Sequence, residues 1–138
     1  MQKNIVSLSV IAVITAILFT VSSCESGGNH TPTICFRITT DSVSYQSSYL
    51  TLPRDSTFNL FIAASKTGPD GILKTFKITK SVNGGADTTL MDANVTTQYY
   101  SQFYTYKAGD SGTVERYTFT IGNSENLYKS IEFVDTVR

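Results

Sequence analysis

The chain has 138 residues, with 11 basic and 11 acidic side chains, so its formal net charge is zero. This length suits one domain with a single hydrophobic core and is too short for two. The balanced charge predicts no nucleic-acid partner, because nucleic-acid binding needs a clustered basic surface.

Residues 1–23 have the pattern of a secretory signal peptide. Lys3 is the only charge before an apolar stretch that runs from Ile5 to Val21. A short basic region followed by an apolar region is typical of such signals. The alternative is a transmembrane anchor, but the stretch is at the lower length limit for a membrane-spanning helix and Ser and Thr residues interrupt it.

The apolar stretch ends in the run Val21-Ser22-Ser23-Cys24. This run resembles the lipobox of bacterial lipoproteins, which has an aliphatic residue, two small residues and then cysteine. The resemblance implies that the signal is cut before Cys24, whose thiol carries a diacylglyceryl group. Several acyl chains hold a protein firmly on a membrane, whereas one chain binds only marginally. Cys24 is therefore expected to be a lipid attachment site, and the membrane to be a partner.

Residues 24–32 are rich in Ser, Gly and Asn and show no apolar periodicity, which predicts a flexible tether before a domain at 33–138. Once Cys24 is lipidated, Cys35 is the only other cysteine and has no intramolecular disulfide partner. We expect Cys35 to be a small half-buried strand residue. A reactive thiol or a dimer contact is the alternative.

From residue 33 the dominant pattern is a two-residue alternation in short runs rich in Thr, Tyr, Phe, Val and Ile, without a convincing amphipathic helix. The run at 57–64 is apolar on both faces, which predicts a central strand. Asn83-Gly84-Gly85 predicts a hairpin turn. The expected strands cover 34–40, 48–52, 57–64, 73–82, 88–91, 95–106, 114–121 and 127–134.

This pattern predicts an all-β fold, a single immunoglobulin-like β-sandwich of about seven strands. The segment Gly109-Asp110-Ser111-Gly112, the run from Tyr117 to Ile121, a polar turn and residues 127–133 resemble the last two strands of Ig-like and PKD-like extracellular modules. The resemblance implies that Tyr117 is a corner tyrosine whose hydroxyl bonds back to the preceding loop. The turn lacks the usual Asp-x-x-Gly, and the chain contains no tryptophan.

Lipoproteins with a short Ser/Gly tether and such a domain resemble those of the Bacteroidota, which implies an outer-membrane location. The leaflet stays open, because Glu25 is the only acidic residue in the tether. In this group an O-glycosylation system recognises Asp, then Ser or Thr, then an aliphatic residue or Thr. The alternative is chance matching in a Thr-rich chain. Four tripeptides match, and they place possible sugars on Ser42, Ser56, Thr88 and Thr136.

We expect no enzyme and no cofactor. His30 is the sole histidine and lies in the tether, so the domain cannot assemble a histidine-based triad, acid–base pair or histidine metal site. No EF-hand or Asp-rich repeat is present, so no metal is expected. Two distant carboxylates meeting in the fold to cut a glycosidic bond are the alternative.

The aromatic run at 99–106 is the most suggestive binding feature. Alternation places Tyr100, Tyr104 and Tyr106 on one face, with Tyr99 and Phe103 on the other. If the first face is exposed, its rings could stack on sugar or peptide. Otherwise these tyrosines are good strand formers on a half-buried surface.

Two functions of different class follow. The first is a non-catalytic interaction module that docks on an envelope protein, for example by adding a strand to an edge such as 127–134. The second is a glycan-binding module of an outer-membrane carbohydrate uptake system. An exposed aromatic platform away from a sheet edge favours the second function, and a buried aromatic run with an open, uncharged edge favours the first.

Overall fold

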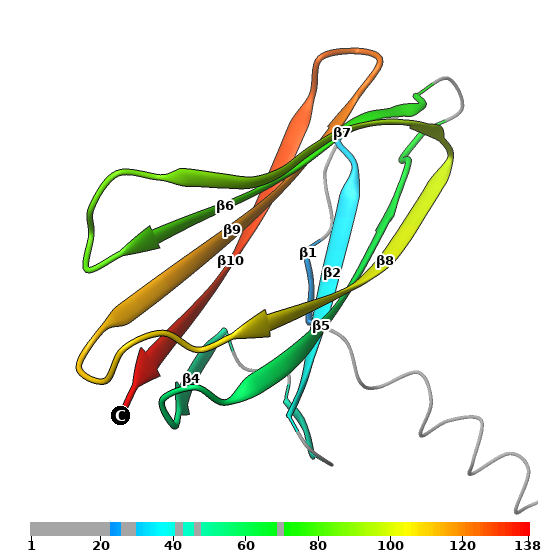
Figure 1. Ribbon diagram of the computed structural model, residues 1–138. Coiled ribbons are helices and arrows are strands. Elements are labelled where there is room, and N and C mark those ends of the chain that lie inside the picture. The colour runs from blue at the N-terminus through cyan, green and yellow to red at the C-terminus, as the bar shows by residue number, and fades with distance from the viewer. Residues whose placement is uncertain (1–22, 26–29, 41–42, 46–47, 69–70) are drawn as a thin grey trace, which may run out of the picture.

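The computed structural model describes residues 23–25, 30–40, 43–45, 48–68 and 71–138. These residues form an all-β sandwich of two facing sheets, as predicted (Figure 1). Most of residues 1–23, with Val21 and Ser22 of the lipobox-like run, lie outside the described residues, and so does Ser42. The strands are β1 Ser23–Glu25, β2 Thr33–Thr40, β3 Val43–Tyr45, β4 Tyr49–Leu52, β5 Thr57–Ser65, β6 Leu73–Val82, β7 Thr88–Thr97, β8 Tyr99–Lys107, β9 Val114–Asn123 and β10 Tyr128–Val137.

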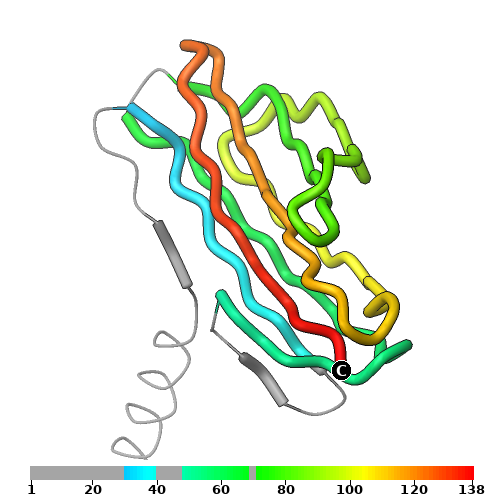
Figure 2. Tube along the Cα trace, turned by 90° about the vertical axis from the view of Figure 1, so that its left-hand side faces the viewer, coloured from blue at the N-terminus to red at the C-terminus, as the bar shows by residue number. Residues whose placement is uncertain are grey.

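One sheet, called sheet A here, has the order β1-β2-β5-β8, with β3 beside β2. The other, sheet B, has the order β4-β10-β9-β6-β7. The chain changes sheet after β3, β4, β5, β7 and β8. Figure 2 shows the long strands of the two layers lying side by side. Strands β2, β5 and β8 of sheet A face strands β10, β9 and β6 of sheet B, and β7 is added next to β6. This is an immunoglobulin-like arrangement.

Alternating apolar residues build the core between the sheets. Ile34, Phe36 and Ile38 of β2 are buried, and the residues between them are half-buried on the outer face. β5 lies between β2 and β8, which confirms the predicted central strand. Phe58 of β5 and Phe133 of β10 meet across the sandwich with their ring centroids 5.6 Å apart.

The turn after β6 also follows from the sequence. Asn83 and Gly84 both have positive φ, 51° and 72°, and the N–H of Gly85 donates to the carbonyl of Val82 at 2.9 Å. Two successive residues with positive φ give a turn whose twist matches that of the two strands. The predicted hairpin between β6 and β7 is therefore confirmed.

The structure differs from the expected strands in several places. β1 and β3 were not expected, and β7 extends from Thr88 to Thr97 without ending at residue 91. The expected strand 95–106 is divided at Gln98, because β7 belongs to sheet B and β8 to sheet A. The expected edge at 127–134 is covered only at its last residue, because β4 pairs in parallel with β10 from Val134 to Val137. The alternation of apolar and polar residues along the sequence predicts neither the change of sheet nor this parallel pairing.

Two parts of the predicted tether are held by the domain. β1 pairs antiparallel with β2, so that Cys24 and Cys35 are register partners. The carbonyl of His30 accepts a hydrogen bond from Nδ2 of Asn123 at 2.9 Å. These contacts place the start of the tether at the edge of sheet A and its end at the β9–β10 turn.

Candidate functional site

The three tyrosines singled out as stacking residues, Tyr100, Tyr104 and Tyr106, point into the sandwich from β8. They are half-buried and pack against the core. The ring centroid of Phe76 lies 4.9 Å from that of Tyr100 and 6.1 Å from that of Tyr104. The hydroxyls of Tyr100 and Tyr104 are 2.8 Å apart, and the latter donates to Sδ of Met91 at 2.8 Å.

The exposed face of β8 is the opposite one. Tyr99 is 57% exposed and Phe103 is 69% exposed. The three tyrosines Tyr100, Tyr104 and Tyr106 therefore do not form an exposed platform. The inward phase of β8 faces sheet B, and burial of three aromatic rings there is worth more than leaving them in water.

A cleft of about 360 Å³ opens between β7 and β8 on this side of the sandwich. Its walls combine aromatic rings, aliphatic side chains and two lysines, the mixture expected of a small-molecule site. Burial raises the pKa of Tyr106 to about 12, so its hydroxyl stays protonated at neutral pH. The lining residues are Lys80, Leu90, Met91, Tyr104, Thr105, Tyr106, Lys107 and Tyr117.

A buried polar cluster lies behind the cleft. The Nζ atom of Lys80 is 2.7 Å from Oε1 of Glu115, whose side chain is only 3% exposed. The hydroxyl of Tyr117 donates to Oε2 of Glu115 at 3.0 Å, and Lys80 Nζ lies 5.2 Å from the centroid of the Tyr117 ring. A Cβ atom on Gly109 would collide with the Glu115 carboxylate. The carboxylate is thus paired, hydrogen-bonded and enclosed.

This geometry corrects the role predicted for Tyr117. Its hydroxyl does not bond to the preceding loop; it bonds to Glu115 two residues earlier in the same strand. Glu115 occupies the inward phase of β9, so its carboxylate is the nearest strong acceptor. Burial and the neighbouring Glu115 charge raise the pKa of the Tyr117 hydroxyl, which keeps it a donor.

A second buried acid, Asp135, is the register partner of Glu115 on β10. It is fully buried, and neither of its carboxylate oxygens has a hydrogen-bond partner. Burial, helped by the charge of Glu115 and opposed by Lys80, raises the pKa of Asp135 to about 6. Perturbed carboxyl groups of this kind gather at functional sites, although structural ion pairs also produce them.

Sequence reasoning missed this cluster, although one signal was present. Glu115 shares the alternating phase of Tyr117 and Phe119, and Asp135 shares that of Phe133 and Val137, all of which are buried. An acidic residue in the apolar phase of a strand therefore marks a buried charge. Its partner, Lys80, follows Phe76 and Ile78 in the inward phase of β6 and not at the rim of the sheet.

β8 forms the outer edge of sheet A. It pairs with β5 from Thr57↔Lys107 to Ser65↔Tyr99 without a register shift. Residues 99–106 contain no charge and no proline. By contrast, the pairing of β6 with β7, the long edge of sheet B, has two register shifts. Natural edge strands are normally protected by charge, proline, bulges or shortness. Residues 99–106 have none of these protections, and Lys107 is the one charge at the end of β8.

The possible glycosylation residues fall in different environments. Thr88 is exposed at the start of β7, next to an exposed Asp87. Thr136 is exposed, but the Asp135 of its tripeptide is fully buried. The Oγ atom of Ser56 is buried without a hydrogen-bond partner. In the folded protein only the Thr88 tripeptide, among those that the structure describes, presents both its acid and its hydroxyl.

Cys35 is half-buried on β2, as predicted, and it is disulfide-bonded. The expectation that it has no intramolecular disulfide partner applies to a chain whose Cys24 carries a lipid, and it stays a prediction for that form. The chain has one other cysteine, Cys24, which is its register partner. A sulfur atom that carries a lipid in a thioether cannot also form a disulfide.

His30 lies at the surface, with its Nδ1 atom 3.4 Å from Oε2 of Glu125. Within the described ranges no group of three or more His, Cys, Asp or Glu side chains could hold a metal ion. The same part of the chain contains no helix long and apolar enough to cross a membrane.

No family model and no curated protein matches the chain. Among solved structures it is similar to the CARDB domain of a Pyrococcus furiosus protein in complex with di-metal ions, with a TM-score of 0.45 and 11% identity over 81% of this chain and 100% of that one. It is also similar to superoxide reductase (neelaredoxin) from Ignicoccus hospitalis, with a TM-score of 0.47 and 14% identity over 99% and 100% of the two chains. A third similar structure is β-glucosidase from Listeria innocua in complex with glucose, with a TM-score of 0.41 and 10% identity over 73% of this chain and 16% of the enzyme. Likeness at this level assigns no ligand, metal or activity.

Proposed function

We propose that the protein is a lipid-anchored, non-catalytic interaction module of the bacterial cell envelope, and that it docks a strand of a partner protein on the edge of β8. The observation that carries this proposal is the unprotected edge itself. An edge strand presents a row of backbone N–H and C=O groups that a partner strand can pair with. Ser101, Gln102 and Phe103 are exposed in succession at the middle of β8.

The anchor rests on the lipobox-like run that ends in Cys24. Lipidation there would place the protein on the outer membrane, in a leaflet that stays open. The pairing of β1 with β2 consists of backbone ladder contacts and would bring the domain close to the lipid. Docking would then take place next to a membrane.

The chemistry of the buried acids supports a non-catalytic role. Glu115 is already neutralised by Lys80 and hydrogen-bonded by Tyr117. Asp135 is fully buried, so a substrate could not reach it without opening the sandwich. A general acid or base must lie within hydrogen-bond reach of the reacting group.

Site-specific photo-crosslinking in the native envelope tests the docking edge. The crosslinking side chain replaces Gln102 on β8, and the control replaces Thr89 on β7, which is also exposed. We expect a discrete adduct only from position 102, attached to an extended, uncharged segment of the partner. The substitution Ser101→Pro should abolish the adduct, since proline removes a backbone donor. Equal adducts from both positions, or none, would refute docking at β8.

The cleft between β7 and β8 favours glycan binding as a second candidate function. Tyr104 and Tyr106 line it with ring surface, and Lys80 and Lys107 add donors. Aromatic rings with polar tips suit sugar recognition. Calorimetric titration with a panel of oligosaccharides tests this function, and Tyr106→Phe, which keeps the ring and removes the hydroxyl, should weaken any specific binding. Absence of binding across the panel would leave the docking function alone.

A further inference from the structure

The outer face of sheet A carries a row of aromatic and basic side chains. Arg37, Phe61 and Phe103 are register partners across β2, β5 and β8. The ring centroids of Phe61 and Phe103 are 4.7 Å apart, and the Arg37 guanidinium carbon lies 5.7 Å from the centroid of Phe61. With Tyr99, 57% exposed, these residues form what we call the aromatic face.

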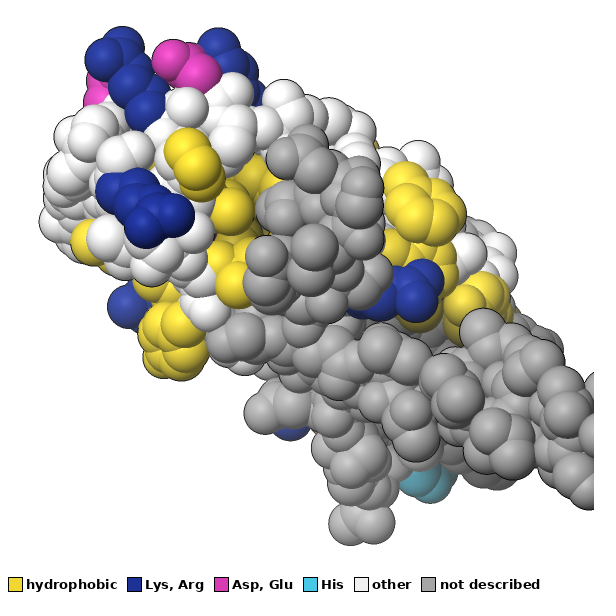
Figure 3. Space-filling model, turned by 90° about the horizontal axis from the view of Figure 1, so that it is seen from below, with side chains coloured by type: hydrophobic (Ala, Val, Ile, Leu, Met, Phe, Trp, Pro, Cys, Tyr) yellow, Lys and Arg dark blue, Asp and Glu magenta, His cyan; other side chains and the backbone are white. Residues whose placement is uncertain are grey.

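The aromatic face contains no acidic residue. The outward positions of β2, β5 and β8 carry two charges, Arg37 and Lys107, both basic. Lys107 pairs with Asp55 in the turn before β5, at 2.7 Å between Nζ and Oδ1. Figure 3 shows an end of the molecule, where basic side chains and some acidic ones lie around exposed hydrophobic ones. The outer face of sheet B differs, because Arg116 and Glu132 form an ion pair there.

The residue expected to carry the lipid lies in the same sheet. Cys24 is in β1, and its register partner, Cys35, is on the outer face of β2, two residues before Arg37. Three strand spacings separate β1 from β8, which amounts to roughly 14 Å. A lipid at Cys24 would therefore enter the membrane within roughly 14 Å of the aromatic face.

We propose that the aromatic face lies on the lipid surface to which Cys24 anchors the protein. Tyrosine, whose ring has a polar tip, favours the interface between membrane and water, exposed phenylalanine rings bury apolar surface there, and basic side chains favour its phosphate groups. Phe103 and Tyr99 sit among the headgroups, and Arg37 faces the phosphates. The inference rests on the lipid anchor of the proposed function, and it adds an orientation in which the β8 edge points along the membrane toward partners held there.

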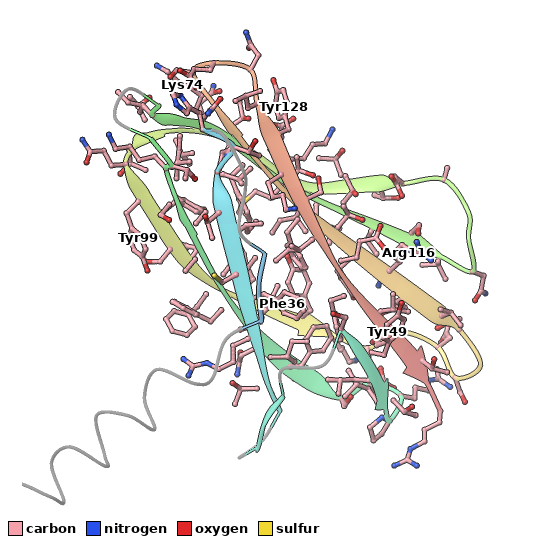
Figure 4. The ribbon with its side chains drawn as sticks, turned by 180° about the vertical axis from the view of Figure 1, so that it is seen from behind. Phe36, Tyr49, Lys74, Tyr99, Arg116 and Tyr128 are labelled. Atoms are coloured by element: carbon pink, nitrogen blue, oxygen red, sulfur yellow. The ribbon has the colours of Figure 1, made fainter. Side chains whose placement is uncertain are left out.

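A single tryptophan reports this contact, since the chain has none of its own. Tyr99 and Tyr128 are matched positions, each 57% exposed, on the outer faces of opposite sheets (Figure 4). The lipidated mature variants Tyr99→Trp and Tyr128→Trp are placed in vesicles of mixed zwitterionic and anionic phospholipid. Brominated lipids should quench the tryptophan at position 99 several-fold more than that at position 128.

Flotation with the vesicles separates failure of the anchor from failure of the orientation. A protein that does not float lacks the anchor, and both proposals fall. A protein that floats but shows equal quenching at the two positions keeps its anchor and overturns the membrane-facing orientation. If the tryptophan at position 99 has blue-shifted emission but is not quenched, it contacts protein and not lipid, and this result would also overturn the membrane-facing orientation. In the Tyr99→Trp protein, Phe103→Ser should reduce the quenching, with circular dichroism confirming that the fold is intact.

Discussion

Glu115 and Asp135 stand directly opposite each other on β9 and β10, and both carboxyl groups are buried between the sheets. One cation, Lys80, contacts Glu115, and no side chain hydrogen-bonds to Asp135. Two buried acids that share one cation cannot both ionise without cost. The fold therefore holds one carboxylate and one carboxyl group that resists ionisation.

The stability of the protein should fall as the pH rises through the range set by Asp135. Its pKa is raised from 3.8 to about 6 in the folded state, so between these values the folded protein binds more protons than the unfolded chain. The contribution of protonated Asp135 to the free energy of unfolding is complete below pH 4 and is lost by pH 6 to 7. At about 1.4 kcal/mol per pKa unit it amounts to about 3 kcal/mol.

Asp135→Asn should flatten this part of the pH profile of unfolding free energy, measured with urea between pH 4 and 7. The exposed Asp92→Asn is the matched control and should leave the slope unchanged. An unchanged slope in Asp135→Asn would show that Asp135 titrates normally.

Removing Lys80 should destabilise the protein strongly. Lys80→Met leaves the Glu115 carboxylate buried without its cation, which costs about 3 kcal/mol of unfolding free energy. Glu115→Gln in the same background should recover most of this loss, because the uncompensated charge is gone. A double-mutant cycle at neutral pH gives the coupling, and strictly additive losses would contradict a direct pair.

The two faces of β8 should respond differently to truncation. Tyr104→Ala removes a half-buried ring that packs on Phe76 and should lower the unfolding free energy by about 2 kcal/mol. Tyr99→Ala removes an exposed ring and should change it by less than about 0.5 kcal/mol. Denaturant midpoints measure both. A larger loss at Tyr99 would mean that the outward face is covered in the folded protein.

If the Asp-Ser/Thr tripeptides are used in the native host, the sugar should be on Thr88. Thr88→Ala should lower the intact mass of the mature protein by one glycan, whereas Ser56→Ala should lower it only by the missing oxygen. The reason is access, because Ser56 Oγ is buried and Asp87 and Thr88 are exposed. A glycan that persists in Thr88→Ala would place the modification on another residue. A residue that is buried in the folded protein would then have been modified before folding.

Local alternation was enough to predict most strands and their buried faces. In the expected strand 34–40, Ile34, Phe36 and Ile38 share the buried face because successive side chains of a strand point to opposite sides. The Asn83-Gly84-Gly85 turn was also predictable, since few residues tolerate positive φ. The division at Gln98 was not, because the runs before and after it have the same pattern and differ only in the sheet that they join.

By itself the sequence determined that the fold is all-β and which phase of most strands is apolar, because both follow from local side-chain chemistry. It also held the lipobox-like run at Cys24, on which the expected anchor rests. Only the tertiary structure decided that Tyr104 faces inward while Phe103 faces outward, that β8 forms an edge, and that Lys80, Glu115 and Asp135 meet. These relations depend on which strands become neighbours and on which sheet each strand joins, and no local pattern specifies that order.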